Sequence, residues 1–242
     1  MSNHRVYISA STQSENIGVG AYGTEQSRMM YLADRIKYWL GTQSGKYTVF
    51  RNSPGWTLQQ TVNDCNALNC ELFIDNHSNA DSSPRTGGSE AFYYHQGGTT
   101  SNSYRLAKEI YKRIAPLSPG ADRGVLPDNA YVSSLYVIQQ TTPPAALIEH
   151  FFHSNPVEVN DYLTHIDGYA KETAKGVAAF CGELWTETVA QIQSIEMLVD
   201  EMIKDGIVSN RDHWIGVLKG TITPVPAYLQ VAFSQATKKI GW

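Results

Sequence analysis

Residues 71–80 read Glu-Leu-Phe-Ile-Asp-Asn-His-Ser-Asn-Ala, in which three apolar residues are followed by a run of polar ones. A short, continuous apolar run of this kind is typical of a strand that is buried on both faces of a parallel sheet. In open α/β sheets, ligands bind beyond the carboxyl ends of the strands. The polar residues 75–79 are therefore candidates for a functional site.

Two other apolar segments end in the same way. Val6-Tyr-Ile8 runs into polar residues 9–13, and Ala145-Ala-Leu-Ile148 runs into residues 149–153. Thr24 can cap a helix, and the apolar residues after it recur at helical spacing. Other segments predict further elements: strands at 47–50, 89–94 and 135–138, and helices at 58–67, 104–114 and 155–185. Alternating strands and helices predict an α/β fold, a largely parallel twisted sheet with helices on both faces. The polar strand ends should gather at one edge of that sheet.

The pattern changes after Trp185. Ile192, Ile195, Leu198, Met202 and Ile203 form a separate amphipathic stripe that stops at Asp205-Gly206. We therefore place a domain boundary near Glu187, with a first domain at 1–186 and a small C-terminal helical module at 187–242.

The composition excludes several classes of protein. The chain has 242 residues, of which 42% are hydrophobic, and a net charge of −4, so it can bury a core and has no broad basic field for nucleic acid. No apolar run approaches the roughly 18 to 20 residues that span a bilayer, so no membrane insertion is expected. Three cysteines, Cys65, Cys70 and Cys181, are too few for a disulfide framework and are interpreted as buried apolar residues.

Three separate residues are the strongest candidates for chemistry. His77 follows a strand at the ligand-binding edge, and Glu25 begins a helix, where the helix dipole favours a carboxylate. Glu149 emerges directly from a buried strand, and partial burial favours the neutral form of a carboxyl group, which suits acid/base catalysis. Taken singly, His77 fits a hydrogen-bonded loop residue and Glu25 a helix-terminal charge.

Together these motifs resemble the zinc-dependent N-acetylmuramoyl-L-alanine amidases of the amidase-3 family. The resemblance covers about residues 5–185 and depends on Phe-Ile-Asp-Asn-His-Ser-Asn-Ala80, Gly88-Ser-Glu-Ala-Phe-Tyr-Tyr94 and Pro144-Ala-Ala-Leu-Ile-Glu-His-Phe-Phe-His-Ser-Asn155. It implies that His77 and Glu25 bind Zn²⁺ and that Glu149 is catalytic.

One part of the chain departs from the family pattern. The first strand in the family ends in a glycine-histidine-glycine turn whose histidine binds zinc, whereas Thr12 stands at that position here. The stretch Ser9-Ala-Ser-Thr-Gln13 resembles a phage endolysin-like branch of the family. Gln13 is the nearest candidate for the third zinc ligand, and Glu15, His150 and His153 are alternatives. An amide in place of a histidine should hold zinc more weakly.

The resemblance implies an amidase that cleaves the bond between N-acetylmuramic acid and L-alanine in bacterial peptidoglycan. Residues 1–186 would then be the catalytic domain, and the module at 187–242 is expected to bind wall polymer, to self-associate or only to stabilise that domain. Zinc would activate a water molecule, and Glu149 would take its proton. Substrate hydrogen bonds are expected from a set of polar residues: Asn76, Asn79, Glu90, Tyr94 and Arg123. Because the N-terminus has no signal-peptide pattern, we expect an endolysin that is made in the host cytoplasm and acts at the cell wall after release.

Two other functions fit the same sequence. A protein that has lost its metal site could bind peptidoglycan without cleaving it. A zinc peptidase of related fold could act on the stem peptide instead. Metal content separates the first from an amidase, and analysis of the products separates the second.

Overall fold

The computed structural model describes residues 3–131, 135–187, 199–200, 203 and 211–212. The chain divides into two compact units, residues 1–185 and 186–242. Most of the second unit, including the helices expected there and Trp214 and Trp242, lies outside the described residues. Within the described residues, no helix combines the length and the apolar character that a membrane span requires.

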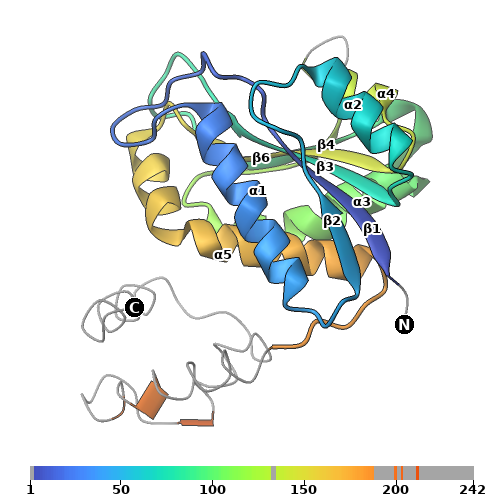
Figure 1. The fold of residues 1–242 in the computed structure, drawn as a ribbon. Helices are drawn as coiled ribbons and strands as arrows, with labels where there is room; N and C mark the ends of the chain where they lie inside the picture. Colours follow the sequence, from blue (N-terminus) through green and yellow to red (C-terminus); the bar gives the residue numbers. More distant parts are fainter. Residues whose placement is uncertain (1–2, 132–134, 188–198, 201–202, 204–210, 213–242) are drawn as a thin grey trace. The chain divides into compact units, whose positions relative to one another are not determined.

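A six-stranded sheet forms the centre of the first unit (Figure 1). Its strands, in spatial order, are β2 (Tyr47–Phe50), β1 (His4–Ala10), β3 (Leu72–Asn79), β6 (Ala145–Phe152), β4 (Ser89–Tyr93) and β5 (Asp122–Pro127). All neighbouring pairs are parallel except β6 and β4, which are antiparallel. The prediction of a largely parallel sheet is confirmed, with β4 and β5 reversed at one side.

Helices cover both faces of the sheet, as expected. The helices are α1 (Glu25–Gly41), α2 (Leu58–Ala67), α3 (Asn102–Ile114), α4 (Tyr136–Gln140) and α5 (Pro156–Phe180), with the short 3₁₀ helices η1 (His95–Thr100) and η2 (Ala115–Leu117). The side chains of α1, α3 and α5 form one buried cluster with strand residues such as Ile74 and Ile148. Those of α2 and α4 form a second cluster with Phe73 and Leu147. Neighbouring residues of a strand belong to different clusters because successive side chains point to opposite faces of the sheet.

Capping residues set the start of the two longest helices. The side chain of Thr24 accepts a hydrogen bond from the Ser27 backbone N–H, so α1 begins at Glu25 as predicted. Asn155 accepts hydrogen bonds from the Val157 and Glu158 backbone N–H groups at the start of α5. Such caps satisfy donors that have no partner within the helix. Both helices therefore begin next to the edge where β3 and β6 end.

The structure corrects three expectations. Residues 135–138 were expected to be a strand, but Tyr136–Gln140 is helix α4, in which Val137 and Ile138 are buried. A run of four apolar residues does not distinguish a strand from a buried helical turn. The strand in this region is β5, a half-buried edge strand whose apolar pattern is weak. Cys181 was expected to be buried but is only partly buried, and the helix expected over 155–185 ends at Phe180.

Candidate active site

Three acidic or basic side chains lie side by side across three neighbouring strands. His77 on β3 is directly opposite Glu149 on β6, and Glu149 is directly opposite Glu90 on β4. Directly opposite residues point to the same face of a sheet and stand about 5 Å apart. Glu90 joins this row from the beginning of its strand, because β4 runs in the opposite direction to β3 and β6.

His77 is held between two carboxylates. Its Nδ1 lies 2.8 Å from Oε1 of Glu25, and its Nε2 lies 3.0 Å from Oδ2 of Asp75. All three residues are buried. Burial alone would lower the pKa of His77, but Asp75 and Glu25 outweigh it and raise that pKa well above its usual value. Burial also works against ionisation of Glu25, yet the hydrogen bond with His77 lowers the pKa of this carboxyl.

Gln13 lies beside this pair, as the sequence suggested. Its Nε2 is 3.4 Å from Nδ1 of His77. Asn16 connects Gln13 to Glu25, since its Nδ2 is 2.6 Å from Oε1 of Gln13 and 2.7 Å from Oε2 of Glu25. The backbone N–H of Glu25 donates to the carbonyl of Asn16 at 2.8 Å. Nothing in the sequence pattern marked Asn16, whose contacts appear only when the loop folds against α1.

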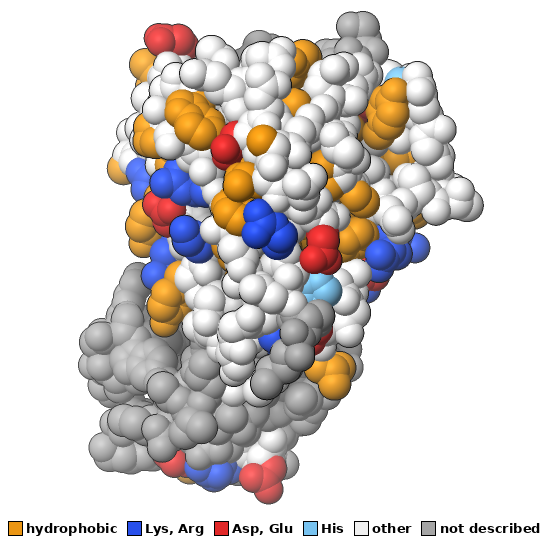
Figure 2. Space-filling view, turned by 45° about the vertical axis from the view of Figure 1, so that its right-hand side comes forward, with side chains coloured by type: hydrophobic (Ala, Val, Ile, Leu, Met, Phe, Trp, Pro, Cys, Tyr) orange, Lys and Arg blue, Asp and Glu red, His pale blue; other side chains and the backbone are white. Residues whose placement is uncertain are grey.

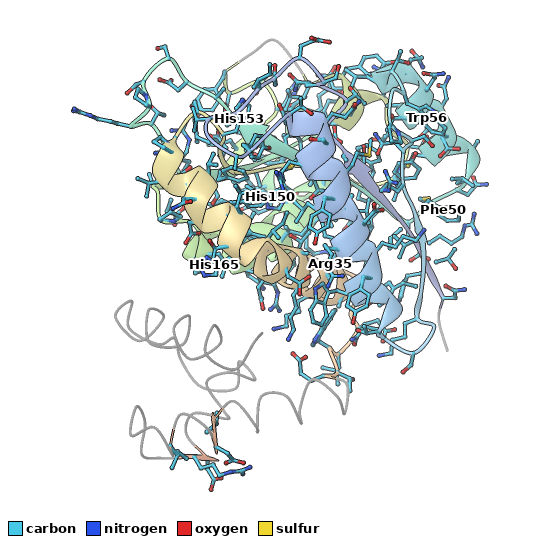
Figure 3. The ribbon with its side chains drawn as sticks, turned by 60° about the vertical axis from the view of Figure 1, so that its left-hand side comes forward. Arg35, Phe50, Trp56, His150, His153 and His165 are labelled. Carbon is cyan, nitrogen blue, oxygen red and sulfur yellow. The ribbon has the colours of Figure 1, made fainter. Side chains whose placement is uncertain are left out.

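The other candidates for a third ligand make different contacts. Glu15 is exposed and accepts a hydrogen bond from Ser14. His150 lies in the interior near α5, with Nε2 3.0 Å from the amide oxygen of Asn76 (Figure 3). The Nδ1 of His153 lies 2.9 Å from the hydroxyl of Ser78. Within the described part of the chain, no three His, Cys, Asp or Glu residues are grouped so that they could hold a metal ion.

Glu149 has the properties of an acid/base catalyst. It is half-buried, and its Oε2 has no hydrogen-bond partner among the described residues. Burial raises its pKa to about 8; His77 opposes this shift, and the negative charges of Glu25, Glu90 and Asp75 add to it. A carboxyl group with a pKa near neutrality both accepts and donates a proton under physiological conditions.

Three of the residues expected to contact substrate form one network. Glu90 pairs with the Nε of Arg123 at 3.0 Å and accepts a hydrogen bond from Asn79 at 2.7 Å. The other two residues are not part of it. The Asn76 amide donates to the carbonyl of Ser9 in the interior, and Tyr94 follows the end of β4, at the opposite edge of the sheet. The reversed direction of β4, which the sequence did not reveal, explains the misplacement of Tyr94.

The surface carries charges of both signs. On the face shown in Figure 2, Lys and Arg side chains of the described residues are interspersed with Asp and Glu side chains. This mixture agrees with the small net charge of −4.

Comparison with known proteins identifies the family. The family model for N-acetylmuramoyl-L-alanine amidase, Amidase_3, matches residues 12–179. The N-acetylmuramoyl-L-alanine amidase LytC of Bacillus subtilis (strain 168) is 34% identical over 104 residues, which are 43% of this chain and 20% of LytC. The germination-specific N-acetylmuramoyl-L-alanine amidase of the same organism is 33% identical over 101 residues, 42% of this chain and 40% of the relative. The chain therefore matches well under two thirds of either relative.

Solved structures show the same fold. The catalytic domain of CwlV, an N-acetylmuramoyl-L-alanine amidase from Bacillus (Paenibacillus) polymyxa var. colistinus, has a TM-score of 0.66 at 24% identity, covering 75% of this chain and 99% of that domain. An N-acetylmuramoyl-L-alanine amidase from Clostridium difficile 630 has a TM-score of 0.65 at 20% identity, covering 75% and 98%. Since the family model matches more than half of the chain, the chain belongs to the Amidase_3 family of N-acetylmuramoyl-L-alanine amidases.

Proposed function

We propose that this protein hydrolyses the amide bond between N-acetylmuramic acid and L-alanine in bacterial peptidoglycan. The observation that carries the proposal is the position of Glu149, whose free carboxyl oxygen stands in the same row as His77. Membership of the amidase family supplies the substrate class, and the row of polar side chains supplies the groups for the reaction.

The residues present fit a divalent cation, for which we propose Zn²⁺. Nδ1 of His77 and Oε1 of Glu25 are both lone-pair atoms when His77 is neutral with its proton on Nε2, so their 2.8 Å separation needs a proton or a metal ion between them. Asp75 holds the opposite ring nitrogen, which is how a carboxylate behind a metal-binding histidine orients its ring. Gln13 would complete the set with its amide oxygen. Zn²⁺ held by these residues would supply the acidity that activates water near neutral pH and would polarise the scissile carbonyl.

Glu149 carries the proton transfer in this proposal. As a carboxylate it takes the proton of the attacking water molecule, and as a carboxylic acid it returns that proton to the leaving nitrogen of L-alanine. Its raised pKa suits both steps, because the carboxylate is a stronger base than an ordinary glutamate. Burial sustains this pKa, and the negative charges of the neighbouring carboxylates add to it.

We also propose an endolysin role, in which the enzyme reaches the cell wall after release from the host cytoplasm. The phage-like stretch Ser9-Ala-Ser-Thr-Gln13 supports this role. We further propose that residues 187–242 bind wall polymer or self-associate. The test of the endolysin role is to produce the enzyme inside bacterial cells and to measure the wall fragments released with and without permeabilisation of the cell membrane. Release only after permeabilisation would show that access to the wall limits lysis.

The test is digestion of purified cell-wall sacculi by the full chain. The products should carry new N-terminal L-alanine and free lactyl carboxyl groups, and a chelator should stop their release. Glu149→Gln should lower the rate by at least about 100-fold, which is the usual size of an acid/base contribution. The control is Glu172→Gln, which changes a glutamate of α5 paired with Lys175.

Three outcomes would contradict the proposal. Full activity of Glu149→Gln would remove the catalytic assignment. Wall binding without any released product would favour a non-catalytic binding protein. Cleavage within the stem peptide, with no new lactyl carboxyl groups, would indicate a peptidase.

A further inference from the structure

Arg123 pairs with Glu90, the strand neighbour of Glu149, and its guanidinium group has no role in the chemistry described above. We propose that Arg123 is a receptor for a carboxylate on the peptide side of the scissile bond. The enzyme would then favour substrates in which the second residue of the stem peptide has a free carboxylate over those in which this group is a carboxamide. This inference rests on the proposed amidase function and defines its substrate more narrowly.

A buried acidic residue fixes the position of Arg123. Glu90 is 0% exposed, and its two carboxyl oxygens are used separately. Oε2 accepts the Nε–H of Arg123 at 3.0 Å, and Oε1 accepts the amide of Asn79 at 2.7 Å. A carboxylate is removed from water at high cost unless it is paired and hydrogen-bonded. The pairing therefore holds the guanidinium in one place.

An irregularity in strand β5 directs Arg123 toward Glu90. Ser89 of β4 is opposite Asp122, but Ala91 is opposite Val125, so β5 has one extra residue between these points. Arg123 and Gly124 both face Glu90, and Gly124 has a φ of 90°, which favours glycine. Bulges of this kind turn a side chain toward a site. The chain thus departs from regular strand geometry where it places the arginine.

Aromatic rings pack around the guanidinium and leave part of it open. The Cζ of Arg123 lies 5.0 Å from the centre of the Phe152 ring and 6.0 Å from that of Tyr131. The Arg123 side chain is 27% exposed, and Tyr131 is 62% exposed. Glu90 takes up the Nε–H, and Tyr131 forms one further hydrogen bond with the Arg123 side chain, so the other N–H groups of the guanidinium are left for a ligand. Their fork geometry matches the two oxygens of a carboxylate.

The position of Arg123 fits the length of a stem peptide. Glu90 is the strand neighbour of Glu149, and β5 is the next strand beyond, so Arg123 lies two strand spacings, or roughly 10 Å, from the backbone of Glu149. The long arginine side chain shortens this distance. Two extended residues span about 7 Å. A carboxylate on the second residue of the stem therefore comes within reach of Arg123 when the first residue lies at Glu149.

The test compares two ligands that differ only in this group, N-acetylmuramoyl-L-alanyl-D-glutamate and N-acetylmuramoyl-L-alanyl-D-isoglutamine. Binding to the full chain is measured by calorimetry in the Glu149→Gln background, where turnover does not interfere. The acid should bind about 10- to 100-fold more tightly than the amide, the range of a charge-assisted pair of hydrogen bonds. In a second arm, the wild-type enzyme should digest sacculi with free carboxylates faster than amidated sacculi.

Arg123→Lys is the informative variant, because it keeps a positive charge near Glu90 but loses the fork of donors. Its preference for the acid should fall by about tenfold, because an ammonium group attracts the carboxylate but cannot form the paired hydrogen bonds, and its melting temperature should stay near that of the parent. Arg113→Lys, at an ion pair between α3 and α5, is the matched control and should keep the preference for the acid. Circular dichroism confirms that each variant folds.

The outcomes separate this inference from the proposed function. Equal binding of acid and amide by the parent protein, or an unchanged preference in Arg123→Lys, would overturn the carboxylate receptor even if sacculi are digested. A preference for the acid that Arg123→Lys reduces would support the receptor, and absence of sacculus digestion would then count against the amidase function alone.

Discussion

The Nδ1 atom of His77 lies 2.8 Å from Oε1 of Glu25, although one residue belongs to strand β3 and the other begins helix α1. Both side chains are buried, so the contact is made out of reach of bulk water. The Thr24 cap sets the start of α1, and the register of β3 against β1 and β6 sets the height of His77. A local cap and a long-range strand register thus bring together the two side chains that we propose share one metal ion.

Asn16→Ala should weaken zinc binding by about 10- to 100-fold, the usual effect of losing a residue that orients ligands. Its amide bridges Gln13 and Glu25 at 2.6 and 2.7 Å, so its removal releases both side chains. Competition with a chromophoric chelator measures the affinity. Asn63→Ala, on the exposed side of α2, should leave the affinity unchanged. Equal affinities for the two variants would show that Asn16 does not position the site.

Gln13→His should strengthen zinc binding by at least about tenfold, because imidazole nitrogen is a better zinc ligand than an amide oxygen. The side chain already lies 3.4 Å from Nδ1 of His77. Zinc retained after dialysis against a weak chelator checks this prediction. Gln59→His places a histidine on α2 instead and should have no effect. Weaker retention by Gln13→His would remove Gln13 from the ligand set.

Glu149 should make the metal-free protein less stable as the pH rises. Burial raises its pKa to about 8 from a usual value of 4.5, so the folded state favours the protonated carboxyl. This stabilisation is complete below about pH 4.5 and is lost as the pH rises to about 8. The loss should amount to at least about 2 kcal/mol, since one pKa unit corresponds to about 1.4 kcal/mol and partial exposure reduces the full value.

The free energy of unfolding in urea is measured for wild type and for Glu149→Gln between pH 4.5 and 9, with EDTA present. The difference between the two proteins at each pH gives the contribution of Glu149. Other groups titrate in both proteins, so the difference reports Glu149. The variant should gain stability relative to wild type with rising pH, whereas Glu172→Gln should not. Parallel curves for wild type and Glu149→Gln would contradict the raised pKa.

Glu158→Gln should destabilise the protein by about 2 kcal/mol. The buried Glu158 carboxylate accepts the Gly88 backbone N–H at 2.6 Å and the Phe152 backbone N–H at 2.7 Å. It therefore ties together the segments that carry Glu90 and Glu149. A glutamine has one oxygen, so one of these donors would face an NH₂ group.

The free energy of unfolding in urea checks the Glu158 prediction. Glu109→Gln, in a partly exposed ion pair with Lys112, should change stability by less than about 0.5 kcal/mol. Similar losses for both variants would mean that the two backbone contacts of Glu158 contribute little.

Much of this architecture could be predicted from local patterns. The apolar run of residues 72–74, the Thr24 cap and the spacing of α2 each depend on near neighbours in the chain, so strands β1, β3 and β6 and the helices α1 and α2 follow from the sequence. Because parallel strands end at one edge, the meeting of His77 and Glu149 was expected as well.

Other features depended on long-range packing. The reversal of β4 places Glu90 beside Glu149 and moves Tyr94 to the far edge, and no local pattern encodes strand direction. The bulge that turns Arg123 toward Glu90 and the bridge of Asn16 between Gln13 and Glu25 exist only once distant segments pack together. Short segments are enough to identify which residues can carry the chemistry, because side-chain chemistry and local periodicity are local properties. Which of these residues share one site depends on the fold, since burial and strand pairing are set by the whole chain.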